Sequence, residues 1–261
     1  MEQPDFIEAG GGEKVILVHS SVAGARQWRS LMEVLAPDFH VIAINLFGYG
    51  KTRAWDGDGT QRLADQARLI EPFLPEGDGK VSIVGHSFGG SVAMMAAAMF
   101  RHHVERLVLI EPNPFYLLKL HGRFDAYEEA VTLRNAIKES GKAGTWDAAA
   151  AVFADYWTGA GSWDAMSEDR RAKFAHALAP NYFEWDAVLN EDKPLAEWRR
   201  DLPRETTFVL AKDTVRSIRE IAGLMQEHAP DWHFREIERG GHMAALSEPD
   251  EINRIVVDAL S

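Results

Sequence analysis

Short apolar runs separated by longer amphipathic stretches dominate the first 110 residues of the chain. Such runs, about four to eight residues long and rich in Val, Ile and Leu, are typical of strands buried on both faces. Strands that alternate with helical stretches predict right-handed βαβ units and a parallel sheet. The expected strands are Phe6–Ala9 at a sheet edge, Lys14–His19, His40–Asn45, Val81–Val84 and Arg106–Glu111, with helices at about 26–35, 60–73 and 91–100.

The pattern changes after Pro114, where the chain shows helical stretches and no convincing strand until about residue 206. Of the 26 aromatic residues, 14 lie between residues 113 and 200. This enrichment predicts an apolar layer over a binding site, together with a small helical core of its own. The elements expected from here on are helices at 128–138, 146–156 and 169–178, a strand at 206–211, a helix at 217–228, an edge strand at 233–238 and a closing helix at 248–260.

These elements predict an α/β fold with a mostly parallel central sheet flanked by helices. We expect residues 1–112 and 201–261 to form its core. A helical cap of residues 113–200 is expected to be inserted after the strand at 106–111.

The turn between the strand at 81–84 and the following helix carries the sequence Gly85-His86-Ser87-Phe88-Gly89. A serine at a sharp strand-to-helix turn exposes its hydroxyl, and a side chain at Gly85 or Gly89 would collide with the neighbouring strand and helix. The first N–H groups of the helix have no partner within it and can face a developing negative charge. The pattern therefore predicts that Ser87 is a nucleophile and that the Phe88 N–H belongs to an oxyanion hole.

Composition narrows the classes of partner. The chain has 261 residues, a net charge of −12 and no cysteine, which excludes disulfides, thiolate metal sites and a cysteine nucleophile. The negative charge disfavours nucleic acid and anionic membranes, so we expect a small-molecule substrate. The acidic start, Met1–Asp5, lacks the apolar region of a signal peptide, and no apolar run is long enough to span a membrane, which favours a cytoplasmic location. Metal-ligand spacing is absent, so we predict neither metal nor cofactor; the oligomeric state, monomer or homodimer, stays open.

A serine nucleophile needs a base, and the base needs a group that orients it. His242 follows two glycines in a turn after the last expected strand, and Asp213 follows the preceding strand, 29 residues earlier. Both lie where the carboxyl ends of parallel strands meet Ser87. Glu111 is the alternative acid because it ends the strand at 106–111. Turn context and the spacing to His242 favour Asp213.

The chain resembles the α/β-hydrolase superfamily from about Lys14 to its end. The residues that carry the resemblance are His19, Gly85-His86-Ser87-Phe88-Gly89-Gly90, Lys212-Asp213, and Gly240-Gly241-His242-Met243 with Ser247-Glu248-Pro249. The resemblance implies a nucleophile at Ser87, a base at His242, an acid at Asp213, and a cap between about Asn113 and Arg200.

One departure from the family concerns the loop after the strand at 14–19. The family has His-Gly there, whereas this chain has His19-Ser20. We expect the Ser21 N–H to complete the oxyanion hole beside Phe88 and His19 to shape the loop. The hydroxyls of Ser20 and Ser21 are candidates for a third hydrogen bond to the oxyanion. In the cap, Glu184 is expected to be a solvated charge.

The expected activity is hydrolysis of a small apolar or aromatic carboxylic ester through an acyl-enzyme. The same residues would also serve a thioester, an amide or a C–C bond beside a ketone, because a fold does not fix its chemistry. Ser87 excludes the relatives with an aspartate nucleophile, namely the epoxide hydrolases and haloalkane dehalogenases. Ser87-Phe88-Gly89-Gly90 is also similar to cofactor-free perhydrolases. The alternative from another class is a non-catalytic small-molecule binding protein on this scaffold.

Overall fold

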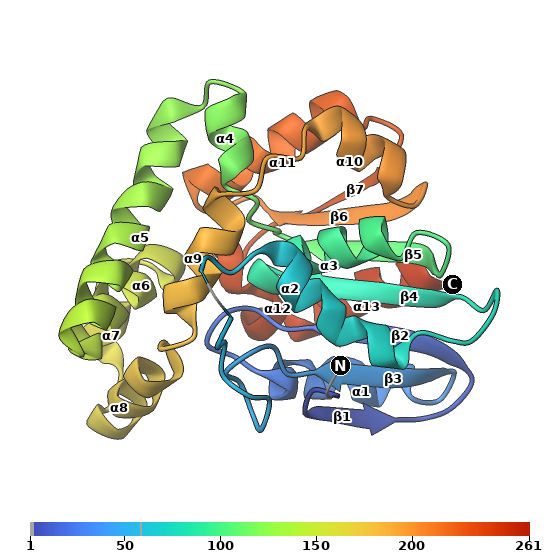
Figure 1. Cartoon of the computed structure of the whole chain (residues 1–261), viewed down its shortest axis with the longest axis horizontal. Helices are drawn as coiled ribbons and strands as arrows, with labels where there is room; N and C mark the ends of the chain where they lie inside the picture. The colour runs from blue at the N-terminus through green and yellow to red at the C-terminus, as the bar shows by residue number, and fades with distance from the viewer. Residues whose placement is uncertain (1–2, 58) are drawn as a thin grey trace.

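The computed structural model describes residues 3–57 and 59–261, so Met1 and Glu2 of the acidic start lie outside the described residues. Its centre is a seven-stranded sheet of order β1-β3-β2-β4-β5-β6-β7 (Figure 1). β1 pairs with β3 in antiparallel fashion, and the other five neighbouring pairs are parallel. The mostly parallel sheet predicted from the sequence is confirmed. The strands are β1 (Phe6–Ala9), β2 (Glu13–Val18), β3 (Phe39–Ile44), β4 (Val81–His86), β5 (Val104–Ile110), β6 (Glu205–Ala211) and β7 (His233–Ile237).

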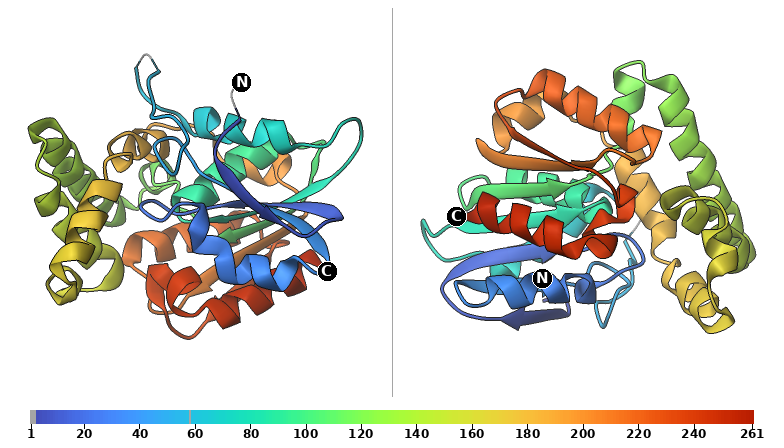
Figure 2. Two further views of the ribbon diagram at one scale, coloured as in Figure 1. Left: turned by 90° about the horizontal axis from the view of Figure 1, so that it is seen from below. Right: turned by 180° about the vertical axis from the view of Figure 1, so that it is seen from behind.

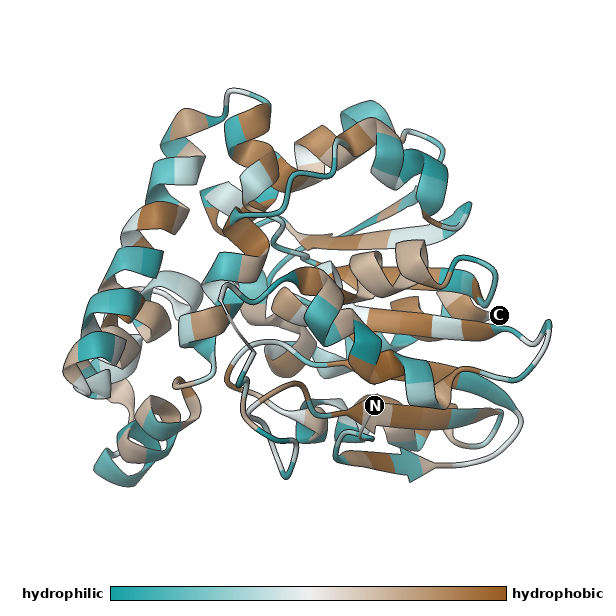
Figure 3. Ribbon diagram, in the orientation of Figure 1, coloured by the Kyte–Doolittle hydropathy of each residue, from teal (hydrophilic) through white to brown (hydrophobic). Residues whose placement is uncertain are grey.

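Helices cover both faces of the sheet (Figure 2). In β2, Val15 and Leu17 belong to the apolar cluster under α1 and α13, whereas Ile16 and Val18 belong to the cluster under α2 and α3. This alternation is the reason the inner strands carry apolar residues on both faces, and Figure 3 shows β3 and β4 as mainly hydrophobic. The helices outside the β5–β6 connection are α1 (Arg29–Leu35), α2 (Leu63–Ala67), α3 (Phe88–Met99), α11 (Arg216–His228), α12 (Ala244–Ser247) and α13 (Pro249–Leu260), with 3₁₀ turns at η1 (Ala25–Trp28), η2 (Arg68–Phe73) and η3 (Gly241–Met243).

The connection between β5 and β6 is a helical insertion, residues 116–201, beside the carboxyl ends of the parallel strands (Figures 1 and 2). Three of its helices match those predicted, and four shorter ones were not predicted. Two of these, α9 and α10, begin directly after Pro180 and Pro194, because proline is tolerated at a helix start. Within the described residues, no helix is long and apolar enough to cross a membrane. The insertion comprises α4 (Tyr116–Leu120), α5 (Phe124–Ala143), α6 (Trp146–Thr158), α7 (Ser162–Ala165), α8 (Glu168–Ala177), α9 (Asn181–Leu189) and α10 (Leu195–Asp201).

Backbone strain is concentrated at the carboxyl ends of three adjacent strands. Among the described residues, the non-glycine positions with positive φ are Val22 (69°), Ser87 (55°) and Glu111 (46°). They follow β2, β4 and β5, which are neighbours in the sheet. Residues in such sparsely populated conformations persist where the surrounding structure holds them, and they cluster at functional sites.

The strained turn at Ser87 depends on very close backbone packing. A Cβ at Gly89 would lie 2.3 Å from the carbonyl oxygen of His19 and 2.4 Å from that of Val18. A Cβ at Gly85 would lie 2.4 Å from the carbonyl oxygen of Gly89. The two glycines therefore allow α3 to begin against β2 and β4, as predicted from the sequence.

Two histidines are completely buried beneath the loops at this edge. His19 donates from Nδ1 to the Ser20 carbonyl (2.7 Å) and accepts the Leu46 N–H at Nε2 (3.1 Å). His86 accepts the Gln27 side-chain amide at Nδ1 (3.0 Å) and donates from Nε2 to the His242 carbonyl (2.8 Å). Burial lowers the pKa of His19 to about 4 and that of His86 to about 3. Both rings are therefore neutral in the folded protein.

We expect Gly89→Ala to destabilise the fold by about 3 kcal/mol or more, because backbone atoms cannot move away from the new methyl group. The matched control is Gly223→Ala in α11, where nothing lies within 4 Å of the place the new methyl group would take. That change should stabilise the protein by about 1 kcal/mol, since alanine is the better helix former. Urea unfolding followed by circular dichroism measures both. A Gly89→Ala midpoint equal to that of the wild type would contradict the close-approach argument.

The buried histidines predict acid sensitivity. Below the ordinary histidine pKa of 6.5 the unfolded chain binds protons at His19 and His86, whereas the folded chain does not until about pH 4 and 3. The free energy of unfolding should therefore fall with decreasing pH by about 1.4 kcal/mol per pH unit for each ring. Urea unfolding between pH 7 and 5 should show a shallower slope in His86→Gln. The exposed His102→Gln should keep the wild-type slope, and equal slopes in all three proteins would refute this account.

Candidate active site

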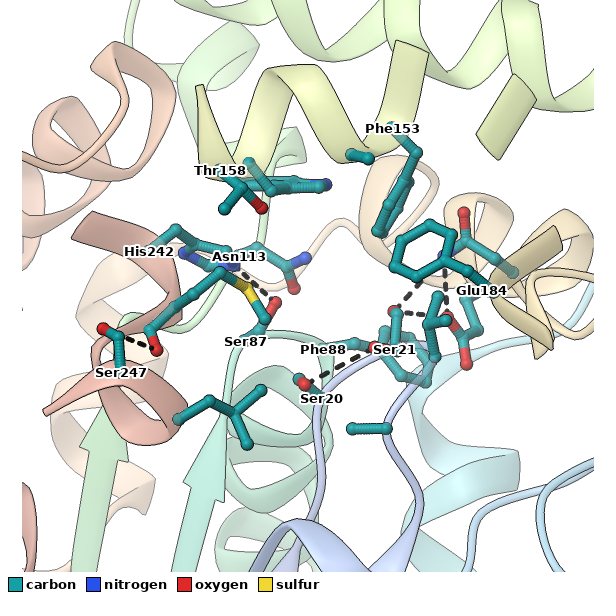
Figure 4. A pocket seen from close by; sticks show the side chains of 18 of the residues that line it. Ser20, Ser21, Ser87, Phe88, Asn113, Phe153, Thr158, Glu184, His242 and Ser247 are labelled. Atoms are coloured by element: carbon teal, nitrogen blue, oxygen red, sulfur yellow. Dashed lines mark hydrogen bonds between the residues drawn. The ribbon is translucent and has the colours of Figure 1, made fainter. Parts of the chain in front are cut away.

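Three side chains form a continuous hydrogen-bonded chain at the carboxyl edge of the sheet. Ser87 Oγ lies 2.7 Å from His242 Nε2, and His242 Nδ1 lies 2.9 Å from Glu111 Oε2. Ser87 joins β4 to α3, Glu111 follows β5, and His242 lies in η3 after β7. All three are buried. The arrangement has a hydroxyl, a base within reach of its proton and a carboxylate that fixes the base, which is the geometry of an activated nucleophile. Figure 4 shows the hydrogen bond between Ser87 and His242.

The prediction that Asp213 orients His242 is wrong, because Glu111 occupies that position. The Glu111 carboxylate also accepts hydrogen bonds from the Ala211 N–H (2.8 Å) and the Thr214 hydroxyl (2.6 Å). The Asp213 side chain is exposed and accepts the N–H groups of Gly240 (3.2 Å) and Gly241 (2.8 Å). Asp213 therefore holds the turn that carries the histidine, and does not contact its ring.

An aromatic side chain of the insertion lies against the imidazole. The ring centroids of Trp157, in α6, and His242 are 4.0 Å apart, with an angle of 30° between the planes. On the core side, the ring centroids of His86 and His242 are 5.5 Å apart, and His86 Nε2 donates a hydrogen bond to the His242 carbonyl. Sequence reasoning missed Trp157 as a neighbour of the histidine, since the only signal was the general abundance of aromatic residues.

The loop after β2 lies next to the nucleophile, with Ser20 and Ser21 at the same cavity as Ser87 and Phe88. The Ser20 hydroxyl donates to Gln27 Oε1 (2.8 Å), and the Ser20 N–H donates to the same atom (3.1 Å). The serine that replaces the family's glycine is therefore engaged by Gln27, which in turn bonds His86. Phe88 is the first residue of α3, so its N–H stands at the helix start.

Glu184 of α9 is buried beside this loop, with only 1% of its surface exposed, so the expectation of a solvated charge is wrong. Its carboxyl group accepts hydrogen bonds from the Ser21 hydroxyl (2.5 Å), the Tyr49 hydroxyl (2.8 Å) and the Asn181 side-chain amide (2.8 Å). Burial raises the pKa of Glu184, and these three hydrogen bonds oppose the rise. Burial and the neighbouring Glu184 also raise the pKa of Tyr49. Figure 4 shows Ser21 and Glu184 facing one another at the cavity wall.

A cavity of about 420 Å³ opens above Ser87, between the sheet edge and the insertion. Its size suits a small organic molecule. The apolar part of the lining comes mainly from the insertion, from the loop at 21–23, and from η3 and α12. The apolar lining residues are Val22, Ala23, Phe88, Phe153, Ala154, Trp157, Met166, Phe174, Trp185, Val188, Met243 and Leu246.

Comparison with known sequences gives a consistent family. The model of the "Alpha/beta hydrolase family" matches residues 15–255. The 2-hydroxy-6-oxo-6-(2'-aminophenyl)hexa-2,4-dienoic acid hydrolase of Metapseudomonas resinovorans is 38% identical over 110 residues, 40% of this chain and 37% of that protein. A soluble epoxide hydrolase of a Corynebacterium species is 34% identical over 110 residues, 42% of this chain and 38% of that protein. Each alignment thus spans less than half the length of the relative.

A solved structure extends the likeness to the whole fold. A carboxylesterase of Nitrososphaera gargenis superposes with a TM-score of 0.72 at 19% identity, covering 98% of this chain and 93% of that one. At this identity the likeness concerns the fold. Because the family model matches nearly the entire length, the chain belongs to the α/β-hydrolase family.

Proposed function

We propose that the protein is a serine hydrolase that cleaves a small apolar or aromatic carboxylic ester through an acyl-enzyme. The observation that carries this proposal is the chain of hydrogen bonds from Ser87 through His242 to Glu111, which opens on a largely apolar cavity. In this proposal Glu111 replaces Asp213 as the acid. The helical insertion acts as the cap that shapes the cavity and separates the reaction from bulk water.

In the first half of the reaction, Ser87 Oγ attacks the ester carbonyl while its proton moves to His242 Nε2. The carbonyl oxygen becomes negatively charged and is stabilised by the N–H groups of Phe88 and Ser21. The tetrahedral intermediate then collapses, the bond to the alcohol oxygen breaks, and His242 returns its proton to the departing alcohol. The product of this half is an ester between the acyl group and Ser87.

In the second half, a water molecule gives a proton to His242 and attacks the acyl carbon. The bond to Ser87 Oγ breaks, and the proton passes from His242 back to the serine. In both halves the Glu111 carboxylate accepts a hydrogen bond from His242 Nδ1. The carboxylate therefore stabilises the positively charged ring and fixes its tautomer. The buried position of this pair makes the charge–charge interaction stronger than it would be in water.

A second candidate is cleavage of a C–C bond beside a ketone. The Metapseudomonas resinovorans relative is named as a hydrolase of a 2-hydroxy-6-oxo dienoic acid, a compound that contains such a ketone. Arg170 supports this candidate because it lines the cavity and offers a cation for a substrate carboxylate. Comparing an aryl ester with a vinylogous 2-hydroxy-6-keto acid separates the two candidates. Faster turnover of the keto acid, lost in Arg170→Ala, would favour C–C cleavage.

The function is tested with p-nitrophenyl esters from acetyl to dodecanoyl, together with benzoyl. We expect wild-type turnover with an optimum at short or aromatic acyl groups, since the cavity is small and apolar. Ser87→Ala should lose at least about 10³-fold in kcat, because no acyl-enzyme forms. A fluorophosphonate probe should label the wild type and spare the variant. If the wild type neither turns over nor becomes labelled but binds small molecules tightly, the binding-protein alternative is correct.

The identity of the acid gives a separate prediction. Glu111→Gln should lower kcat about 10³- to 10⁴-fold, because the amide favours the wrong tautomer of His242 and leaves the imidazolium unstabilised. Asp213→Asn is the matched control, since Asp213 bonds only the Gly240–Gly241 backbone at this site. It should keep kcat within about tenfold of the wild type. The reverse ranking in steady-state kinetics would restore Asp213 as the acid.

A further inference from the structure

Glu184 connects the helical insertion to two loops of the core. Its Oε2 accepts a hydrogen bond from the Ser21 hydroxyl in the loop after β2, and its Oε1 accepts one from the Tyr49 hydroxyl in the loop after β3. The two partners lie 163 and 135 residues away along the chain. Asn181, one turn earlier in α9, bonds the same Oε2. A carboxyl group this deeply buried is stable only with such partners.

The loop that Glu184 holds is strained. Val22 has a φ of 69°, and a β-branched residue disfavours that conformation strongly. Its N–H donates to the Tyr49 hydroxyl (3.0 Å), and that hydroxyl donates onward to Glu184. The Ser21 side chain thus bonds Glu184 directly, and the Val22 N–H is linked to the same carboxyl group through the Tyr49 hydroxyl. Strain of this kind persists only where neighbouring contacts over-determine it.

The Ser21 N–H is one of the two donors assigned to the oxyanion in the proposed mechanism. Such donors act only when they already point to the place where the charge develops, and a displacement of about 1 Å removes much of their effect. The Ser21 hydroxyl is committed to Glu184, so it fixes the residue through its side chain. The backbone N–H stays available for the substrate.

We propose that Glu184 is a positioning residue that ties the helical insertion to the oxyanion loop and thereby sets the direction of the Ser21 N–H. This inference rests on the proposed serine hydrolase mechanism. Glu184 contributes to the rate through Ser21 and Val22, without touching the reacting atoms. The oxyanion hole is then complete only when the insertion is packed against the loop after β2.

The test compares Glu184→Ala and Glu184→Gln with a control on the same helix. We expect Glu184→Ala to lower kcat about 10- to 100-fold with KM changed less than about threefold, because the transition state loses a donor that the substrate does not need. Glu184→Gln should fall between Ala and wild type, since it keeps one acceptor oxygen. The control is Asp186→Ala, which breaks the 2.6 Å pair with Lys138 away from the loop. Its kcat should stay within about twofold of the wild type.

A second readout separates positioning from general damage. A trifluoromethyl ketone adds to Ser87 and places an oxyanion in the hole, whereas the alcohol product has no carbonyl oxygen to place there. In Glu184→Ala the inhibition constant of the ketone should rise by the same factor as kcat/KM falls, and that of the alcohol should stay unchanged. Val22→Gly should restore part of the lost kcat in the Glu184→Ala background, because glycine adopts positive φ without support.

If Glu184→Ala does not fold, Tyr49→Phe replaces it, since that change removes the bonds to Val22 and Glu184 and keeps the ring. It should show the same selective loss of ketone affinity. The inference is overturned if these variants keep wild-type kcat, or lose ketone and alcohol affinity equally. A wild type that neither hydrolyses esters nor is labelled at Ser87 overturns the proposed function, and this inference with it.

Discussion

The strained backbone at Ser87 is the constraint on which the site depends. Its N–H still donates to the Ile110 carbonyl (2.9 Å), one step beyond the end of β4. The N–H of Glu111 likewise donates to the Val209 carbonyl (3.0 Å), one step beyond the end of β5. The sheet ladder thus continues into both strained residues and holds them in conformations they would leave in an isolated peptide. Ser87 and Glu111 are therefore fixed to the same edge of the sheet, whereas His242 reaches the site from the 3₁₀ turn η3.

His242 is accordingly held at several points. Glu111 bonds its ring, His86 bonds its carbonyl group, and Asp213 bonds the two glycines that precede it. Both candidate carboxylates therefore help to position His242: Glu111 bonds its ring, and Asp213 bonds the backbone of the turn before it. The same His86 connects through Gln27 to Ser20, so the histidine turn and the oxyanion loop share one buried polar network behind the nucleophile. Such a network rigidifies a site when every member is bonded.

The sequence predicted the features that depend on local pattern. Continuous apolar runs located the parallel strands, and Gly85 and Gly89 identified the turn at Ser87, because only close packing requires glycine at both positions. The acid was not predictable in this way. Glu111 and Asp213 both follow strands, and which carboxylate turns toward His242 depends on side-chain reach and on partners such as Ala211 and the Gly240–Gly241 turn.

Glu184 shows the same limit more strongly. In the sequence it stands between Phe183 and Trp185 in a segment for which no helix was predicted, and its partners Ser21 and Tyr49 lie more than 130 residues away. Only tertiary packing reveals that it is buried. The short helices α4 and α7 were missed for a different reason, since a stretch of four or five residues has too few positions for a helical period to appear.

The helical insertion contacts the histidine and the loop after β2 as well as lining the cavity. Trp157 covers one face of His242, and Glu184 holds the loop that carries Ser21. An ionised carboxylate close to a developing oxyanion would repel it, and repulsion is strongest where water is excluded. The Ser21 and Tyr49 hydroxyls and the Asn181 amide donate hydrogen bonds to the Glu184 carboxyl group, and these donors offset that repulsion. The site can therefore use an acidic side chain to position its oxyanion loop with a reduced electrostatic penalty. The same packing of the insertion shapes the cavity and places Glu184. Substitutions in the insertion that alter substrate fit should therefore also change kcat.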